Sequence, residues 1–187
     1  MMRCRIRPRR MLAVVMLVIA QPGGVGATAA TTEGAKQIAG WVEEAQLPLQ
    51  LVLEAKMDTG ADTTSLDIIR MRRFRRDGKS WVSFWVDDPK DDNRRIRFDR
   101  RVVRYSRIKR HSGDRDSRPV VGIDICLGTV TRRVEVNLVD RSEFDYPLLI
   151  GRNFMAGEIV VDPEGEHLLE LDCAPDKADD GGEREDR

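Results

Sequence analysis

The sequence of 187 residues is poor in the side chains that most often bind metals or form disulfide networks. It has two histidines and three cysteines, too few for a histidine-rich metal site or a disulfide scaffold. It also lacks the patterns H-E-x-x-H, C-x-x-C and G-x-x-x-x-G-K-[ST]. These absences disfavour a zinc hydrolase or a P-loop nucleotidase of the usual design, and we expect neither a cofactor nor a metal site.

The charge of the chain is balanced overall but unevenly distributed. There are 32 basic and 32 acidic side chains, yet residues 1–29 contain five arginines and no acid. Without these residues, 27 basic side chains face 32 acidic ones, a net charge near −5. Because nucleic-acid-binding proteins usually have a basic excess, we expect no nucleic-acid partner.

Residues 1–29 have the three-part layout of a secretory signal peptide. The basic segment Met1–Arg10 precedes ten apolar residues, Met11–Ala20, and then a stretch of small, neutral residues that includes Ala27-Thr28-Ala29. Ten apolar residues are too few to span a bilayer as a stable helix, and the small-x-small triplet fits a cleavage site. We therefore expect export to the periplasm or the medium, by the general or the twin-arginine route, and no stable membrane insertion after cleavage. An uncleaved anchor is the alternative.

Two cysteines, Cys126 and Cys173, follow the predicted signal peptide. In an oxidising compartment they could form a disulfide, although two buried thiols also fit the sequence. Residues 30–37 are interpreted as a linker. From Asp172 the chain is acidic and almost free of apolar residues, so we expect residues 172–187 to be a disordered acidic tail.

The segment between residues 38 and 171 predicts an all-β domain, because helical periodicity is scarce and short apolar runs alternate with turn residues. The expected strands are Ile38–Val42, Leu49–Lys56, Ser80–Val86, Arg95–Phe98, Val102–Lys109, Arg118–Cys126, Thr131–Asp140, Tyr146–Ile150, Glu158–Asp162 and His167–Leu171, the last two forming a hairpin. Two stretches rich in arginine, residues 70–76 and 94–110, either bind an anionic ligand or form solvated faces. We favour solvated faces, since aromatic residues that could stack with bases do not interleave with the arginines.

The segment Asp58-Thr59-Gly60-Ala61-Asp62-Thr63 follows an apolar strand and contains the best candidate for a catalytic group. By itself, Asp-Thr-Gly also describes a tight turn, in which the aspartate bonds to the backbone ahead and the glycine takes an unusual φ. About ninety residues later, the apolar run in Leu149-Ile150-Gly151-Arg152-Asn153-Phe154 enters Gly-Arg-Asn. Two motifs that follow each other in this order are a more specific signature than either motif alone.

Together these segments resemble the retropepsins, the retroviral-type aspartic proteases. A bacterial branch of that superfamily, labelled ATP-dependent zinc proteases, is more similar still, and its pattern is matched by Ala55–Ala61, Trp81–Phe84, Arg118–Val121 and Leu148–Arg152. The resemblance implies a retropepsin-like acid-protease barrel over residues 38–171, with one short helix after Gly151. It also implies an aspartic endopeptidase that acts on a peptide or protein substrate.

The same resemblance assigns roles to residues. Asp58 would be the catalytic carboxylate. Because the chain has one Asp-Thr-Gly, the second carboxylate would come from a homodimer, and the two would share one proton. Thr59 would bond across the dimer, and Gly60, followed by Ala61, would let the backbone approach the carboxylates. Asp62 would form an ion pair with Arg152 that supports the loop.

By the same resemblance, the hairpin over residues 104–118 is the candidate for the flap of the retropepsins, with its tip at His111, Ser112, Gly113 and Asp114. This tip is polar, whereas the retroviral tip is rich in glycine and apolar. Two alternatives stay open. One is a non-catalytic peptide-binding module on the same fold, and the other is the metal hydrolase of the family label, for which His111 and His167 are the two available histidines.

Overall fold

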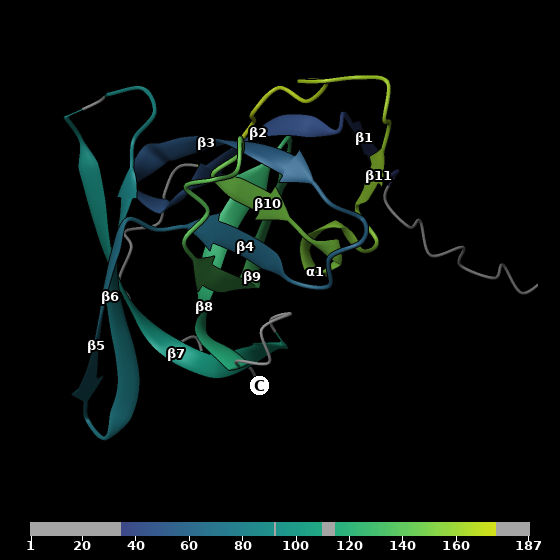
Figure 1. Cartoon of the computed structure of the whole chain (residues 1–187). Coiled ribbons are helices and arrows are strands. Elements are labelled where there is room, and N and C mark those ends of the chain that lie inside the picture. Colours follow the sequence, from purple (N-terminus) through teal and green to yellow (C-terminus); the bar gives the residue numbers. More distant parts are fainter. Residues whose placement is uncertain (1–34, 92, 110–114, 175–187) are drawn as a thin grey trace, which may run out of the picture. The chain divides into compact units, whose positions relative to one another are not determined.

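The computed structural model describes residues 35–91, 93–109 and 115–174, which form two β-sheets and two short helical segments (Figure 1). The smaller sheet pairs β1 (Gln37–Ala39) in parallel with β11 (Ile159–Val161). The larger sheet consists of β2 (Val42–Leu47), β3 (Leu51–Met57), β4 (Thr64–Asp67), β5 (Arg70–Arg76), β6 (Lys79–Asp87), β7 (Arg95–Lys109), β8 (Arg115–Leu127), β9 (Val130–Val139) and β10 (Leu148–Ile150). The helical segments are η1 (Pro48–Gln50) and α1 (Arg152–Met155). In this described part of the chain, no helix has the length and hydropathy needed to cross a membrane.

Six strands of the larger sheet close into a barrel in the order β2-β3-β10-β4-β9-β8, and the pair Gln46–Cys126 joins β2 to β8. Alternate side chains of β3 point into the barrel and are buried, as the two-residue period of a strand requires. β10 lies between β3, to which it is parallel, and β4, to which it is antiparallel. The chain segments that leave β3 and β10 at Asp58 and Gly151 are therefore neighbours. The predicted all-β barrel with one short helix after Gly151 is confirmed.

The other three strands extend the sheet beyond the barrel. β7 pairs with β8 from Val102 onward and with β6 through Arg95–Arg101, and its register shifts between Val102 and Arg104, as at a β-bulge. We call β5, β6 and Arg95–Arg101 the arm (Figure 1). The inner face of the arm buries the stacked rings of Phe84 and Phe98, whose centroids are 5.4 Å apart.

The strands predicted from the sequence differ from the observed ones in three ways. Arg95–Phe98 and Val102–Lys109 are parts of one strand, β7, rather than two strands. β2, β4 and β5 were not expected as strands, and only Val42 of β2 lay within a predicted one. The predicted hairpin of Glu158–Asp162 with His167–Leu171 is wrong, because β11 pairs with β1 and the second segment forms no strand.

The segment that follows β11 is held by side-chain contacts instead. The fully buried carboxylate of Glu43 accepts hydrogen bonds from the backbone N–H groups of Gly40, Leu168 and Leu169. Of the two possibilities that the sequence left open for the cysteines, the structure has the disulfide, Cys126–Cys173, with a sequence separation of 47. The predicted tail, residues 172–187, begins later than expected, because Asp172 donates its backbone N–H to the carbonyl of Gly128 and Cys173 is in the disulfide. The predicted signal peptide and the rest of the predicted tail, from residue 175 onward, lie outside the described residues.

Candidate active site

Asp58 lies directly after β3, in a turn that fixes one of its two carboxylate oxygens. Its backbone N–H donates to the carbonyl of Ile150 at 2.9 Å, which joins the turn to β10. Its Oδ1 accepts hydrogen bonds from the N–H groups of Gly60 at 2.9 Å and Ala61 at 3.1 Å. Oδ2 accepts no hydrogen bond from the described residues. The carboxylate is therefore oriented through one oxygen, and the second is available to a water molecule or a substrate.

The tip of this turn is exposed and small. A Cβ at Gly60 would lie 3.1 Å from Asp58 Oδ1, so a side chain there would crowd the carboxylate. Thr59 and Gly60 are both exposed, and the Thr59 hydroxyl has no hydrogen bond within the described part of the chain. The turn can accordingly contact a second molecule without first breaking a contact of its own side chains.

Arg152, the first residue of α1, holds the turn from the other side. Its Nη1 donates to the carbonyl of Thr59 at 2.7 Å, and its backbone N–H donates to the carbonyl of Ala61 at 2.8 Å. Its Nη2 forms the ion pair with Asp62 that the resemblance implied. The Asp62 side chain is 86% exposed, so the value of this contact is positioning rather than stability. The structure thus brings Asp58, Thr59, Gly60, Ala61, Asp62 and Arg152 together at one loop.

Two residues that the sequence analysis did not single out support the same loop. Asn153 Oδ1 accepts hydrogen bonds from the backbone N–H of Thr64 at 3.0 Å and from its hydroxyl at 2.9 Å. The Thr64 hydroxyl also accepts the N–H of Gly151 at 3.1 Å, and Asn153 Nδ2 donates to the carbonyl of Glu135 at 2.8 Å. The motif Gly-Arg-Asn contains Asn153 and could have drawn attention to it. The motif does not reveal that its partner is Thr64.

Gly151 is required where β10 passes β4. A Cβ at this position would lie 2.7 Å from the backbone carbon of Thr63, closer than such atoms approach in real structures. Only glycine therefore allows the two segments to lie this close.

A guanidinium group lies within electrostatic range of the candidate catalytic carboxylate. Burial lowers the pKa of Arg141, the positive charge of Arg118 lowers it further, and the carboxylates of Asp67 and Asp58 act in the opposite direction. The group nevertheless stays protonated, because arginine does not lose its proton in proteins. The backbone N–H of Arg141 donates to Asp67 Oδ1 at 2.6 Å, which anchors this residue to the end of β4. The site therefore contains positive charge as well as a carboxylate.

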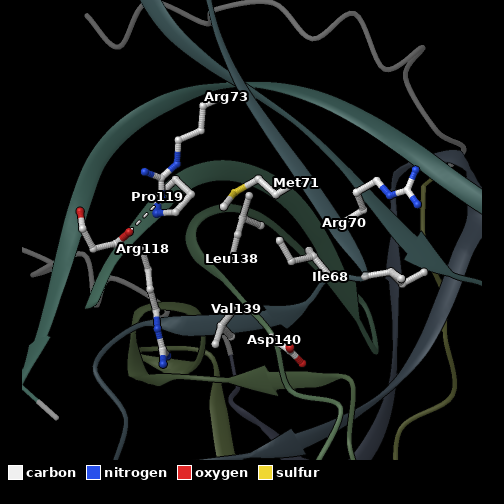
Figure 2. A pocket seen from close by; sticks show the side chains of 11 residues that line it. Ile68, Arg70, Met71, Arg73, Arg118, Pro119, Leu138, Val139 and Asp140 are labelled. Carbon is white, nitrogen blue, oxygen red and sulfur yellow. Dashed lines mark hydrogen bonds between the residues drawn. The ribbon is translucent and has the colours of Figure 1, made fainter. Parts of the chain in front are cut away.

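Arg118 also lines a cavity of about 320 Å³ between the arm and the barrel. Figure 2 shows the apolar side chains of Ile68, Met71 and Leu138 in the middle of the wall, with arginines around them. Arg73 Nη2 donates to the carbonyl of Ser117 at 3.0 Å, which links β5 to β8 at the rim. A ligand in this cavity would meet apolar surface in the centre and guanidinium groups at the edge.

The predicted flap tip, His111, Ser112, Gly113 and Asp114, lies outside the described residues. The strands on either side of it, β7 and β8, pair in antiparallel orientation up to Lys109 and Arg115, and the flap stays a prediction. His167 Nε2 lies 3.6 Å from a carboxylate oxygen of Glu54. Within residues 35–91, 93–109 and 115–174, no three His, Cys, Asp or Glu side chains are placed to share a metal ion.

Comparisons with known proteins concern the domain that contains this site. The sequence model of the family described as "RimB-like: Retropepsin-like aspartic endopeptidase RimB" matches residues 38–169. A crystal structure of Lpg0085, a protein of unknown function from Legionella pneumophila, superposes with a TM-score of 0.61 and 32% sequence identity. The match covers 72% of this chain and 98% of that chain.

The curated relatives have a different name. A probable alpha-L-glutamate ligase from Parasynechococcus marenigrum is 35% identical over 118 residues, which are 63% of this chain and 25% of that protein. A probable alpha-L-glutamate ligase from Desulfotalea psychrophila is 32% identical over 133 residues, 69% of this chain and 28% of that protein. The chain spans about a quarter of the length of these relatives.

Proposed function

Because this chain belongs to the RimB-like family of retropepsin-like aspartic endopeptidases, we propose that it hydrolyses peptide bonds with a pair of Asp58 carboxylates, one from each chain of a homodimer. The observation that carries the proposal is the geometry of Asp58. One of its oxygens is fixed by two backbone N–H groups, and the other is open at the exposed tip of a turn. The turn is braced from behind by Arg152 and Asn153, as a site needs when it must hold its groups in place.

The proposed reaction needs both carboxylates. Two such groups in close contact cannot both ionise, so they share one proton. The ionised group takes a proton from water, whose oxygen attacks the carbonyl carbon of the substrate. The neutral group donates a hydrogen bond to the carbonyl oxygen and stabilises the charge that develops there. Proton transfer to the leaving nitrogen then completes the cleavage.

Replacing Asp58 by Asn tests the chemistry directly. We expect Asp58→Asn to reduce peptide hydrolysis by about 10²–10⁴-fold, because an amide cannot take the proton from water. Asp124→Asn is the matched control, since Asp124 lies on the surface of the barrel in an ion pair with Arg133. The midpoint temperature of thermal unfolding should be the same for both variants as for the unmodified chain. Full hydrolysis by a folded Asp58→Asn variant would exclude the mechanism.

The dimer is tested separately by dilution. If each active site needs two chains, specific activity falls once the protein is diluted below its dimer dissociation constant. Analytical ultracentrifugation at the same concentrations should then show the monomer. Constant specific activity in a monomeric sample would contradict the two-chain site, while leaving the role of Asp58 open to the first test.

We further propose that the substrate carries carboxylates near the cleaved bond. Arg141 lies within electrostatic range of Asp58 and of Arg118, and Arg118 lines the cavity of Figure 2 with Arg70 and Arg73. The curated relatives that share this region are named glutamate ligases, so glutamyl chains are suitable test substrates. A hydrogen bond between charged groups contributes about 1.5–3 kcal/mol, which predicts at least about tenfold preference for a glutamate peptide over its glutamine counterpart.

This preference should disappear at high salt and in Arg141→Gln, and it should persist in Arg133→Gln, which removes an exposed arginine of the barrel. Equal hydrolysis of both peptides would reject the substrate class and leave the endopeptidase proposal intact.

A non-catalytic peptide-binding module is the second candidate, and one observation favours it. The chain corresponds to about a quarter of relatives that are named for a ligase and not for a protease. On this alternative, Asp58→Asn would leave peptide binding unchanged, and the unmodified chain would bind glutamyl peptides without cleaving them.

A further inference from the structure

The outward face of the arm combines arginines with aromatic rings. Successive side chains of a strand alternate between its two faces, and the pairing of β5 with β6 therefore places one set of side chains together. We define the arginine–tryptophan face by Arg70, Arg72, Phe74, Arg76, Trp81 and Trp85. The opposite face of the same hairpin carries Arg73 and Arg75.

The arginines of this face keep most of their charge available to a partner. Arg70, Arg72 and Arg76 are exposed, and within the described part of the chain none of them forms an ion pair. Asp99, on β7, is paired with Arg97, and the charge of Arg76 also acts on it. β5 is an edge strand of the larger sheet, and its positive charge disfavours pairing with a second copy of itself. A different molecule is therefore the better partner for this face.

The guanidinium groups of Arg72 and Arg76 lie over aromatic rings of the same face. Arg72 lies 5.7 Å from the centroid of the Phe74 ring, and Arg76 lies 5.6 Å from that ring and 4.5 Å from the ring of Trp81. Phe74 and Trp81 stack on each other with centroids 6.3 Å apart. Stacking orients a guanidinium plane and leaves its N–H edge free, which is the edge that binds phosphate in a paired geometry.

Two considerations decide which phosphate-bearing partner fits. Single-stranded nucleic acid binds by stacking its bases on open rings, and here Phe74 and Trp81 already carry guanidinium groups. Arginine and tryptophan side by side are instead typical of surfaces that meet anionic lipid headgroups. The Cys126–Cys173 disulfide also fits an oxidising compartment, where the accessible phosphates are those of a membrane.

We infer that the arginine–tryptophan face docks this protein onto a membrane surface rich in anionic phospholipid headgroups. The docking is peripheral, with the guanidinium groups on the phosphates and no strand inserted. It is independent of the reaction at Asp58, so a failure of this inference leaves the proposed hydrolysis untouched.

The test compares two double variants of the same strand in the full chain. Arg72→Gln/Arg76→Gln changes the arginine–tryptophan face, and Arg73→Gln/Arg75→Gln removes the same charge from the opposite face. Binding is measured by flotation with vesicles of equimolar phosphatidylglycerol and phosphatidylcholine. Vesicles of phosphatidylcholine alone measure the contribution of the apolar segment Met11–Ala20.

Each arginine near an anionic surface contributes about fivefold to partitioning, so the first variant should bind about 25-fold more weakly. The second variant should bind within a few-fold of the unmodified chain. If thermal unfolding shows that the first variant is not folded, Arg72→Gln alone replaces it, because Arg72 contacts only the ring of Phe74 and does not line the cavity, and the expected loss is about fivefold.

Three results would overturn the inference. The first is equal binding of the unmodified chain to anionic and neutral vesicles, and the second is an equal loss in both double variants. The third is tighter binding to an oligouridylate than to anionic vesicles at the same salt concentration, with the same dependence on Arg72 and Arg76, which would identify a nucleic-acid surface.

Discussion

The Thr64–Asn153 contact behind the candidate site gives a sharp prediction for the substitution Asn153→Ala. The change removes three hydrogen bonds: two that Thr64 donates and one that Asn153 donates to the carbonyl of Glu135. Each contributes about 1 kcal/mol net, and the backbone N–H of Thr64, which is fully buried, would be left without a partner at a further cost of about 1–3 kcal/mol. We therefore expect the free energy of unfolding to fall by about 4–6 kcal/mol.

Urea unfolding followed by circular dichroism measures this loss as a lower midpoint with an unchanged slope. Asn137→Ala is the matched control. The side-chain oxygen of Asn137 is also buried but accepts no hydrogen bond among the described residues, so its removal should cost less than about 1 kcal/mol. A double-mutant cycle with Thr64→Val should give a coupling energy of about 1–3 kcal/mol. Equal costs for Asn153→Ala and Asn137→Ala, or additive effects in the cycle, would refute the reasoning.

Two further predictions concern the disulfide and the arm. Replacing Cys126 and Cys173 by Ala should lower the free energy of unfolding by about 4 kcal/mol, because the bond closes a loop with a sequence separation of 47. Urea unfolding of the unmodified chain in the presence of a reductant should show the same loss. The stability of the double variant should not change when the reductant is added. Burial raises the pKa of Asp99, but hydrogen bonds from Ser83 and Arg97 outweigh it, so the pKa lies below its ordinary value. The stability that this carboxylate contributes is present above the unfolded-state pKa of about 4 and is lost as the pH falls through the lower folded-state value. Asp99→Asn should therefore reduce stability at neutral pH, with the difference from the unmodified chain shrinking below about pH 4 in a series of thermal unfolding curves.

The turn at Asp58 was predictable because its contacts are local. The carboxylate bonds to the N–H groups of Gly60 and Ala61, two and three residues away, so a short pattern contains the whole geometry. The contact of Thr64 with Asn153 spans 89 residues and depends on β10 lying between β3 and β4. No local pattern contains that arrangement, which explains why these two residues were missed.

The same distinction explains the errors at the C-terminal end and in the arm. The segment that includes Leu168 looked like a strand, but its backbone N–H groups bond to the side chain of Glu43, 125 residues earlier. In the arm, β5 has a single aromatic residue, Phe74, among its arginines, and the sequence therefore favoured a merely solvated face. Across strands, arginines and aromatic residues do interleave, because Phe74 lies opposite Trp81. Side-chain alternation is local, whereas cross-strand neighbours follow from the register.

The position of the disulfide bears on how this protein would behave under proteolytic attack. Cys126 lies on β8 and Cys173 near the end of the described chain, so every residue between them belongs to one covalent ring. A single cut in the exposed loop around Phe144 would open that ring without releasing a fragment. Such a molecule would migrate as one band on a non-reducing gel and as two bands after reduction, and Asp58 and Arg152, on opposite sides of the cut, would stay tethered.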